Sequence, residues 1–339
     1  MNILARLFGT FAGVLAFATL VTASPAPEQA GIVDASEPAY WLKRMVAGFR
    51  EQDYDGILVA NRGAEMRSMR IVHLVRDGQE LERLQYLDGD PVEVIRASHP
   101  TDCVHAGRKL IMGGATGGLL AGIGRGRDLD FDGLYQLELN GSTHVAMRPV
   151  QMLSVIPQDN FRYKHQLYLD KESGLMLKSE VLDANNRVLE TSQFIQIAFG
   201  DQVDPKAIEI SSDEALHEGY HRLPLKTREP DDSSWSLAWL PKGFMQASYQ
   251  RHRIGDADKM VQSRHFTDGI SLFSVFVEES DTSVEPFETR TGSTIAYLVP
   301  KKLGKQWLSV TVVGEIPIQT AMKLTENLKT VEDIAAAGN

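Results

Sequence analysis

The chain has 339 residues, a formal net charge of −10 and a single cysteine, Cys103. The acidic balance argues against nucleic acid as the main partner, and a lone cysteine excludes a disulfide within the chain. The length is sufficient for two domains.

Residues 1–23 have the pattern of a secretory signal peptide. Arg6 is the only charge, the run from Leu7 to Val21 is largely apolar, and Val21-Thr-Ala23 places small residues at a cleavage point. The apolar run is shorter than the roughly 20 residues that span a membrane, so a retained anchor is the less favoured alternative. We therefore expect an exported mature protein that begins near Ser24.

A helix is predicted over residues 36–53. Leu42, Met45, Val46 and Phe49 recur at i, i+3, i+4 and i+7, which is the spacing of one helical face. Such a pattern favours a helix that packs on a sheet by its apolar side.

Short strands are expected after this helix, separated by turn residues. Asp77-Gly78 and Asp88-Gly89 are strong hairpin signals, and Arg62-Gly63 marks another turn. The expected strands cover residues 54–61, 66–76, 81–87, 92–97, 101–106, 134–139 and 145–156.

Residues 113–126 form a glycine-rich segment. Glycine at this density does not hold regular structure well, so we expect a loop. A phosphate-binding loop is not favoured, because no Lys-Ser/Thr follows and no helix opens after a parallel strand. Arg125 and Arg127 are candidates for contacting an anionic headgroup, and the alternative is that both are merely solvated.

The most regular part of the chain is residues 162–199. Three runs alternate between apolar and polar residues, over 163–170, 175–182 and 188–199, with turn residues between them. Leu175, Leu177 and Val181 share one face of the middle run, opposite Lys178 and Glu180. This pattern predicts an antiparallel meander with one buried face.

A curved sheet with many large apolar side chains has two interpretations. Its interior either forms a packed core or takes up acyl chains in a half-closed barrel. The residues alone leave both open. The lipid-pocket candidates are the side chains of the covering helix, namely Leu42, Met45, Val46 and Phe49.

A second domain is expected after a charged, proline-containing connector. The expected division is a half-barrel domain over 24–205, a connector over 206–234, a small α+β domain over 235–330 and a tail over 331–339. Within the second domain we expect strands over 237–240, 244–251, 259–266, 270–278, 293–299 and 307–313, then a helix after Pro317.

The segment His217-Glu218-Gly-Tyr-His221 matches the helical zinc-hydrolase motif, in which two His bind Zn²⁺ and Glu is the general base. Gly219 weakens a helix at its centre, Pro224 ends it, and no third ligand is evident. We therefore interpret the match as chance, and we expect neither a catalytic residue nor a metal or other cofactor. Zinc hydrolysis stays a distant alternative.

Four motifs together resemble the MucB/RseB family of periplasmic sigma-E regulatory proteins. They are the run from Tyr163 to Asp183, Trp239-Leu-Pro-Lys-Gly-Phe244, the hairpin from Arg264 to Val277, and the ending Val310-Thr-Val-Val-Gly-Glu-Ile-Pro317. The similarity extends, with gaps, from about residue 40 to about residue 329. The glycine-rich segment and the His-Glu-Gly-Tyr-His segment depart from the family pattern.

This resemblance implies a mainly β protein with some α structure: an unclosed antiparallel half-barrel like the lipoprotein carriers, with a covering helix, and a smaller α+β domain. It implies a non-enzymatic periplasmic negative regulator that binds the periplasmic part of a membrane-spanning anti-sigma factor and shields it from proteolysis. Lipopolysaccharide or lipoprotein acyl chains are implied signals. The alternative is a periplasmic lipid or lipoprotein carrier.

The resemblance points to the second domain for partner binding, and there we select Arg251, Arg253 and Arg264 as candidate exposed cations. The alternative for each is a solvated position on a strand. The sequence leaves a homo-oligomer open.

Overall fold

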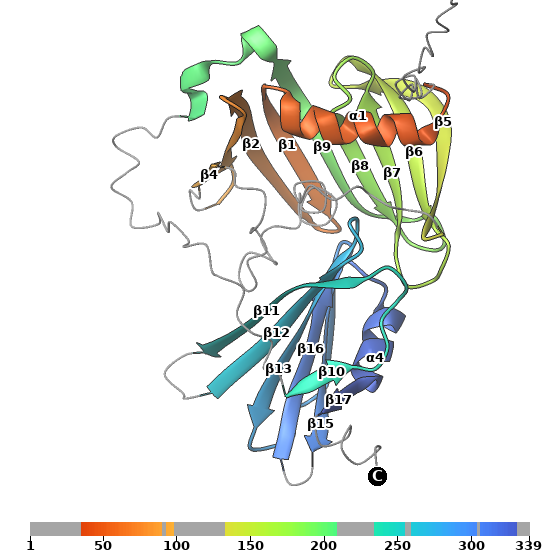
Figure 1. Cartoon of the computed structure of the whole chain (residues 1–339), viewed down its shortest axis with the longest axis vertical. Helices are drawn as coiled ribbons and strands as arrows, with labels where there is room; N and C mark the ends of the chain where they lie inside the picture. Colours follow the sequence, from red (N-terminus) through yellow and green to blue (C-terminus); the bar gives the residue numbers. More distant parts are fainter. Residues whose placement is uncertain are drawn as a thin grey trace, which may run out of the picture. The chain divides into compact units, whose positions relative to one another are not determined.

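The computed structural model describes residues 35–89, 93–97, 133–208, 234–254, 259–303 and 306–330 (Figure 1). The expected signal peptide, the strand over 101–106, the glycine-rich segment with Arg125 and Arg127, and the segment from His217 to His221 lie outside these ranges.

The first domain is one antiparallel sheet, in which the meander β1–β4 and the meander β5–β9 are joined by the pairing of β1 with β9. Its order is β4-β3-β2-β1-β9-β8-β7-β6-β5, so β4 and β5 are its two ends and the sheet is unclosed. The strands are β1 (Tyr54–Arg62), β2 (Glu65–Arg76), β3 (Gln79–Tyr86), β4 (Glu93–Ala97), β5 (Tyr135–Val145), β6 (Arg148–Pro157), β7 (Lys164–Asp170), β8 (Met176–Leu182) and β9 (Val188–Phe199). The expected open half-barrel is confirmed.

Helix α1 (Pro38–Glu51) lies across one face of this sheet (Figure 1). It approaches the β7–β8 turn so closely that a Cβ on Gly174 would lie 2.5 Å from the Arg44 carbonyl oxygen. Gly174 also has φ +79°, which favours glycine. The Arg44 guanidinium donates to the carbonyl oxygens of Lys171, at 3.0 Å, and Glu172. These contacts hold the helix on the turn.

Two apolar clusters lie between α1 and the sheet. In the first, Trp41, Leu42 and Met45 pack with side chains of β5 to β8. The second joins Leu58 of β1 to Phe194 of β9 and to strands on both sides of them. The alternation read from the sequence matches burial in β7, where His165, Leu167 and Leu169 are buried and the residues between them are half-buried.

His165 is a buried basic group of the first domain. It lies on β7 at 4% exposure, opposite Val155 of β6 and Val181 of β8, and its Nε2 atom has no hydrogen-bond partner among the described residues. Burial lowers the pKa of His165 from its ordinary value of 6.5 to about 4. The folded chain therefore binds the His165 proton more weakly than the unfolded chain does.

We expect this histidine to make the first domain sensitive to acid. A lowered pKa in the folded state gives stability that is present above about pH 6.5 and is lost as the pH falls toward about 4. Between neutral pH and about pH 4.5 the loss should be on the order of 2 kcal/mol. Urea unfolding of His165→Gln should show a smaller loss over the same interval, whereas the exposed-site control His144→Gln should match the parent. An equal loss in all three proteins would contradict the assignment.

Residues 200–208 pack against the first domain. Two short 3₁₀ turns, Gly200–Gln202 and Pro205–Ile208, bring Val203 and Ala207 onto Val72 and Leu74 of β2. The Arg83 guanidinium donates to the Ala207 carbonyl oxygen at 3.0 Å. The first residues of the connector expected over 206–234 therefore pack on the first domain. Residues 209–233 lie outside the described ranges.

The second domain is a six-stranded antiparallel sheet with a helix and a two-stranded ribbon. The sheet order is β11-β12-β13-β16-β15-β14, and β10 pairs with β17. Helix α4 (Ile318–Glu326) packs against β15 and β16. The strands are β10 (Trp235–Leu237), β11 (Met245–Ile254), β12 (Lys259–Thr267), β13 (Leu272–Ser280), β14 (Phe287–Thr291), β15 (Thr294–Leu303), β16 (Gln306–Gly314) and β17 (Leu328–Thr330). No helix in the described ranges is long and apolar enough to cross a membrane.

The strand predicted over 145–156 begins later than expected, because β6 starts at Arg148. Strand β5 continues to Val145 through a bulge between Leu139 and Ser142, and the chain turns at Ala146 and Met147. These two residues have φ +48° and +62°. Turns of this type usually carry Asn or Gly, so the sequence offered no turn signal here. The short strands β14 and β17 were not predicted either.

Candidate functional site

The candidate site is the junction at which the second domain contacts the first. One part, which we call the first contact, is built on the β12–β13 turn. Asp268 Oδ1 accepts hydrogen bonds from the backbone N–H groups of Ile270, at 2.9 Å, and Ser271, at 2.8 Å. The Thr267 hydroxyl donates to the Ser271 carbonyl oxygen at 2.9 Å. The turn is therefore fixed by its own side chains before it meets the first domain.

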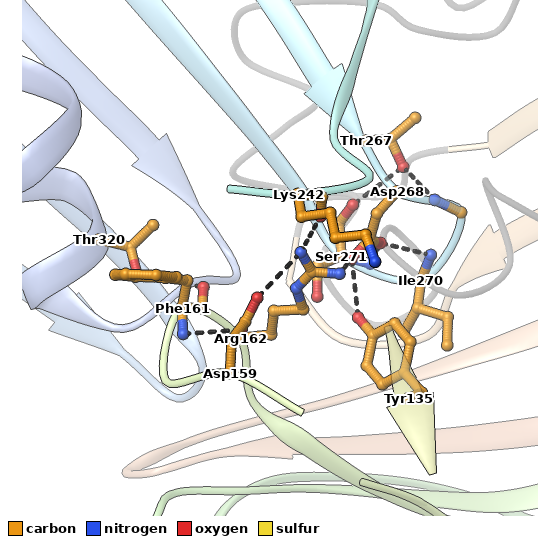
Figure 2. A network of polar contacts seen from close by, with 11 residues as sticks. Tyr135, Asp159, Phe161, Arg162, Lys242, Thr267, Asp268, Ile270, Ser271 and Thr320 are labelled. Carbon is orange, nitrogen blue, oxygen red and sulfur yellow. Dashed lines mark hydrogen bonds and ion pairs between the residues drawn. The ribbon is translucent and has the colours of Figure 1, made fainter. Parts of the chain in front are cut away.

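Arg162 of the β6–β7 loop reaches this turn from the first domain (Figure 2). Its Nη1 atom lies 2.9 Å from Asp268 Oδ2, and both side chains have 0% exposure. The Tyr135 hydroxyl donates to the same oxygen at 2.8 Å. Arg162 Nη2 pairs with Asp159 at 3.2 Å and donates to the Lys242 carbonyl oxygen. One carboxylate of the second domain is thus held by two groups of the first.

Aromatic rings surround the Arg162 guanidinium. Its central carbon lies 5.4 Å from the ring centre of Tyr135 and 5.0 Å from that of Phe244, within cation–π range. Burial and the Asp268 charge raise the pKa of Tyr135 well above its ordinary value, so this phenol stays a donor at neutral pH. The charges are excluded from water and depend on each other for compensation.

Ile270 extends the first contact into the core of the first domain. It has 0% exposure and belongs to the same packed cluster as Trp41, Leu42 and Met45, although it is a residue of the second domain. The aliphatic side chain therefore completes a hydrophobic core formed by α1 and β5 to β8. The β12–β13 turn joins the domains by apolar burial as well as by the ion pair.

The β6–β7 loop also contacts α4. The Thr320 hydroxyl donates to the Phe161 carbonyl oxygen at 3.0 Å. The Phe161 ring lies edge-on to Trp239, with centres 4.9 Å apart, and Lys323 Nζ lies 4.8 Å and 4.2 Å from the two ring centres. A pocket of about 270 Å³ opens beside these rings, lined by Gly133, Leu134, Gln158, Asp159, Phe161, Trp239, Pro241 and Lys242.

A second contact joins the domains through Arg62, Glu190 and Ser293. Arg62 Nε of β1 pairs with Glu190 Oε1 of β9 at 3.0 Å. The Ser293 hydroxyl, from the β14–β15 turn, donates to Glu190 Oε2 at 2.7 Å. Burial, with the Glu190 charge, raises the pKa of Glu315 to about 8, and Arg62 opposes this shift.

The four lipid-pocket candidates lie together on α1. Leu42 and Met45 are buried in the first cluster, where Val46 is half-buried, and Phe49 touches both clusters. The helix therefore covers the sheet with the face that the sequence predicted. Their role in lipid binding stays a prediction.

The partner-binding candidates lie on two neighbouring strands. Arg251 is exposed on β11, an end strand of the sheet, and Arg253 lies two residues further along it. Arg264 differs from the expected exposed cation, because β12 is an inner strand. Its side chain is half-buried, with the guanidinium carbon 4.7 Å from the ring centre of Trp235.

Sequence reasoning missed Asp268, Arg162 and Ile270 as junction residues. Thr267-Asp-Gly269 is a visible turn signal, and Ile270 was placed at the start of the next strand. A turn carboxylate and a loop arginine are usually solvated, so only docking of the two domains reveals their pairing. Within the described ranges, no three His, Cys, Asp or Glu side chains converge where a metal ion would sit.

The chain is thus a two-domain, mainly β protein whose domains are joined through a buried junction. The profile of the MucB/RseB N-terminal domain matches residues 37–212, and that of the MucB/RseB C-terminal domain matches residues 229–329. The chain belongs to the MucB/RseB family, as the sequence motifs predicted.

Curated relatives cover most of the chain. It is 32% identical over 302 residues to the sigma factor AlgU regulatory protein MucB of Pseudomonas aeruginosa, covering 87% of this chain and 92% of that protein. It is 28% identical over 297 residues to the sigma-E factor regulatory protein RseB of Escherichia coli K12, covering 85% and 89%.

A solved structure of MucB in complex with MucA(peri) is similar over both domains. The TM-score is 0.70 at 28% sequence identity, with 87% of this chain and 99% of that chain covered. The Pseudomonas aeruginosa MucA/MucB complex gives a TM-score of 0.70 at 26% identity, with 86% and 98% covered.

Proposed function

We propose that this protein is a periplasmic negative regulator of a sigma-E-type envelope stress response. It binds the periplasmic part of a membrane-spanning anti-sigma factor and shields that segment from proteolysis. The observation that carries the proposal is the likeness over both domains to MucB in complex with MucA(peri). The role is one of binding, and we propose no catalytic activity for the chain.

The buried junction supports this role physically. A regulator that recognises a partner with both domains needs the domains held in a defined arrangement. Domains that became ordered only on binding would lose conformational entropy, and this loss would lower the affinity. The pair formed by Arg162 and Asp268, together with Ile270, supplies such an arrangement through the first contact.

The proposal is tested by binding and protection. The mature protein should bind the periplasmic segment of the anti-sigma factor encoded in its own genome, and it should slow cleavage of that segment by the site-specific envelope protease. A segment from an unrelated single-span membrane protein is the control. No binding, or binding without any protection, would contradict the regulatory role.

We propose that strand β11 contributes to this binding through Arg251 and Arg253. Replacing Arg251 and Arg253 by alanine should weaken binding about threefold to tenfold in low salt and less in high salt, because salt screens the attraction between charges. The matched control is Lys171→Ala with Arg187→Ala, which removes two charges from the first domain. Arg264→Ala is measured separately, since Arg264 also packs on Trp235. Equal weakening in the control would remove β11 from the interface.

Lipid sensing by the half-barrel is a further part of the proposal. An acyl chain gains about 0.8 kcal/mol for each CH₂ group that it buries, and α1 with the sheet offers an apolar lining. The mature protein should bind a dansyl-labelled fatty acid saturably, and Val46→Trp, which adds bulk beside the first cluster, should weaken that binding about tenfold. The exposed control is Met66→Trp. Absence of saturable binding would leave the first domain as a scaffold.

Export and domain division remain our proposals as well. N-terminal sequencing of the mature protein should find Ser24 near the start, and limited proteolysis should cut first within the connector over 206–234. A zinc hydrolase would instead contain stoichiometric zinc and would lose activity in His217→Ala.

A further inference from the structure

The pocket beside Phe161 and Trp239 takes its walls from both domains. Leu134, Asp159 and Phe161 line it from the first domain, and Trp239 and Lys242 line it from the second. Its volume is about 270 Å³, just below the roughly 300 to 1,000 Å³ of pockets that hold drug-sized ligands. The space therefore suits one ring-sized group rather than an extended chain.

The aromatic part of this wall is held in place before any ligand arrives. The Phe161 and Trp239 rings meet edge to face, with centres 4.9 Å apart and an interplanar angle of 69°. Lys323 Nζ lies 4.8 Å from the first ring centre and 4.2 Å from the second, within cation–π range of both. The Thr320 hydroxyl donates to the Phe161 carbonyl oxygen at 3.0 Å. A ligand consequently loses little affinity to ordering of these rings.

Polar side chains share the lining with the rings. Asp159, at 26% exposure, accepts from the Phe161 N–H group at 3.0 Å through Oδ1 and pairs with Arg162 at 3.2 Å through Oδ2 (Figure 2). Each carboxylate oxygen has two acceptor positions, so Asp159 can also accept from a ligand. The exposed side chains of Gln158 and Lys242 add a carboxamide, which donates and accepts, and an ammonium donor.

The charges of the lining disfavour a cationic ligand. A Cβ built on Gly133 would lie 3.2 Å from Lys242 Nζ, so this ammonium group lies against the wall of the pocket. Lys323 lies over the two rings, and Asp159, the carboxylate among the lining residues, is already paired with Arg162. A cation would therefore meet two ammonium groups and a carboxylate that is in use.

The combination of rings, acceptors and donors selects among uncharged groups. An acyl chain would remove water from Asp159 and Gln158 without giving either of them a hydrogen-bond partner. A proline ring of a peptide would pack on Phe161 and Trp239, but it carries no donor for Asp159. A pyranose ring presents C–H surface for contact with the aromatic rings, and each of its hydroxyl groups both donates and accepts.

We propose that this pocket is a saccharide site that binds a single pyranose ring. Hydroxyl groups of the sugar donate to Asp159 and form hydrogen bonds with Gln158 and Lys242, and its C–H surface packs on Phe161 and Trp239. Because the lining comes from both domains, a bound sugar contacts both of them at the junction. The proposal depends neither on anti-sigma binding nor on lipid uptake by the half-barrel.

Saturation-transfer NMR with the full mature protein tests the site, because it observes the sugar directly. The probes are glucose, galactose, mannose and N-acetylglucosamine, and the control is sorbitol, which has the hydroxyl groups without the ring. One or more of these sugars should bind saturably in the millimolar range, at least tenfold more tightly than sorbitol. The methyl glycoside of the sugar that binds distinguishes the source: retained binding indicates the end of a glycan chain, and lost binding indicates a free sugar.

Substitutions locate the binding. Gln158→Ala should weaken it about threefold to tenfold, and the matched control Gln306→Ala, at an exposed position of β16, should leave it unchanged. Trp239→Leu should weaken it at least tenfold, whereas Trp307→Leu, which removes a half-buried tryptophan of β16, should match the parent. Gln158→Ala serves if Trp239→Leu does not fold, because the Gln158 side chain is exposed.

Three results would overturn the saccharide site. One is the absence of saturable binding by all of the sugars, or sorbitol binding as tightly as they do. Another is sugar binding that persists unchanged in both Gln158→Ala and Trp239→Leu, which would place it elsewhere. The third is tighter binding of acetyl-triproline amide than of any sugar, which would assign the pocket to a peptide. None of these measurements includes the anti-sigma segment, so their failure leaves the proposed regulatory role untouched.

Discussion

Replacing Asp268 by alanine is expected to lower the free energy of unfolding by about 3 to 5 kcal/mol. The substitution leaves Arg162 buried with its positive charge uncompensated by this partner, and it removes the acceptor of the Tyr135 hydroxyl. The backbone N–H groups of Ile270 and Ser271 lose their acceptor as well. Urea unfolding followed by circular dichroism measures the change.

Two comparisons make this prediction specific. Arg187→Ala removes a partner of an exposed ion pair, with Arg187 at 73% exposure, and should cost about 0.5 kcal/mol or less. The double variant Arg162→Met with Asp268→Leu should be less destabilised than the sum of its single variants, because the two fully buried charges are removed together. A loss below about 1 kcal/mol in Asp268→Ala would show that water or another group replaces the carboxylate.

The sequence predicted the elements whose patterns are strictly periodic. The helix bearing Leu42 and Met45 and the meander that ends at Phe199 both follow from spacing alone, because burial alternates with the period of the element. The start of β6 was missed because Ala146 and Met147 form its turn against their usual preference. The intrinsic preferences of these residues do not predict such a turn when the pairing of β5 with β6 imposes it.

Only part of the candidate site could be predicted from the sequence. Its pair of Arg162 and Asp268 joins residues 106 positions apart, and neither residue type signals burial. The motifs that carry the family resemblance nevertheless lie at the junction. The segment from Trp239 to Phe244 contributes a ring, the Lys242 carbonyl oxygen and Gly243, where a Cβ would lie 2.4 Å from Leu134. The family resemblance therefore pointed to residues at the junction, and the structure was needed to show what those residues do there.

The junction combines two contacts of different chemistry. In the first contact Arg162 pairs with both Asp268 and Asp159, and the apolar burial of Ile270 extends it. In the second contact Arg62 pairs with Glu190, which also accepts a hydrogen bond from the Ser293 hydroxyl.

Replacing Ile270 by alanine is expected to destabilise the first domain, although the residue belongs to the second. Truncation of a fully buried isoleucine costs about 2 to 5 kcal/mol through lost burial and the cavity left behind. Because Ile270 shares a cluster with Trp41, Leu42 and Met45, hydrogen exchange should accelerate in α1. The matched control is Ile295→Ala, which empties a 1% exposed site in the core of the second domain and should leave exchange in α1 unchanged. If both variants affect α1 equally, Ile270 does not act as a shared core residue, and the apolar part of the first contact carries no coupling between the domains.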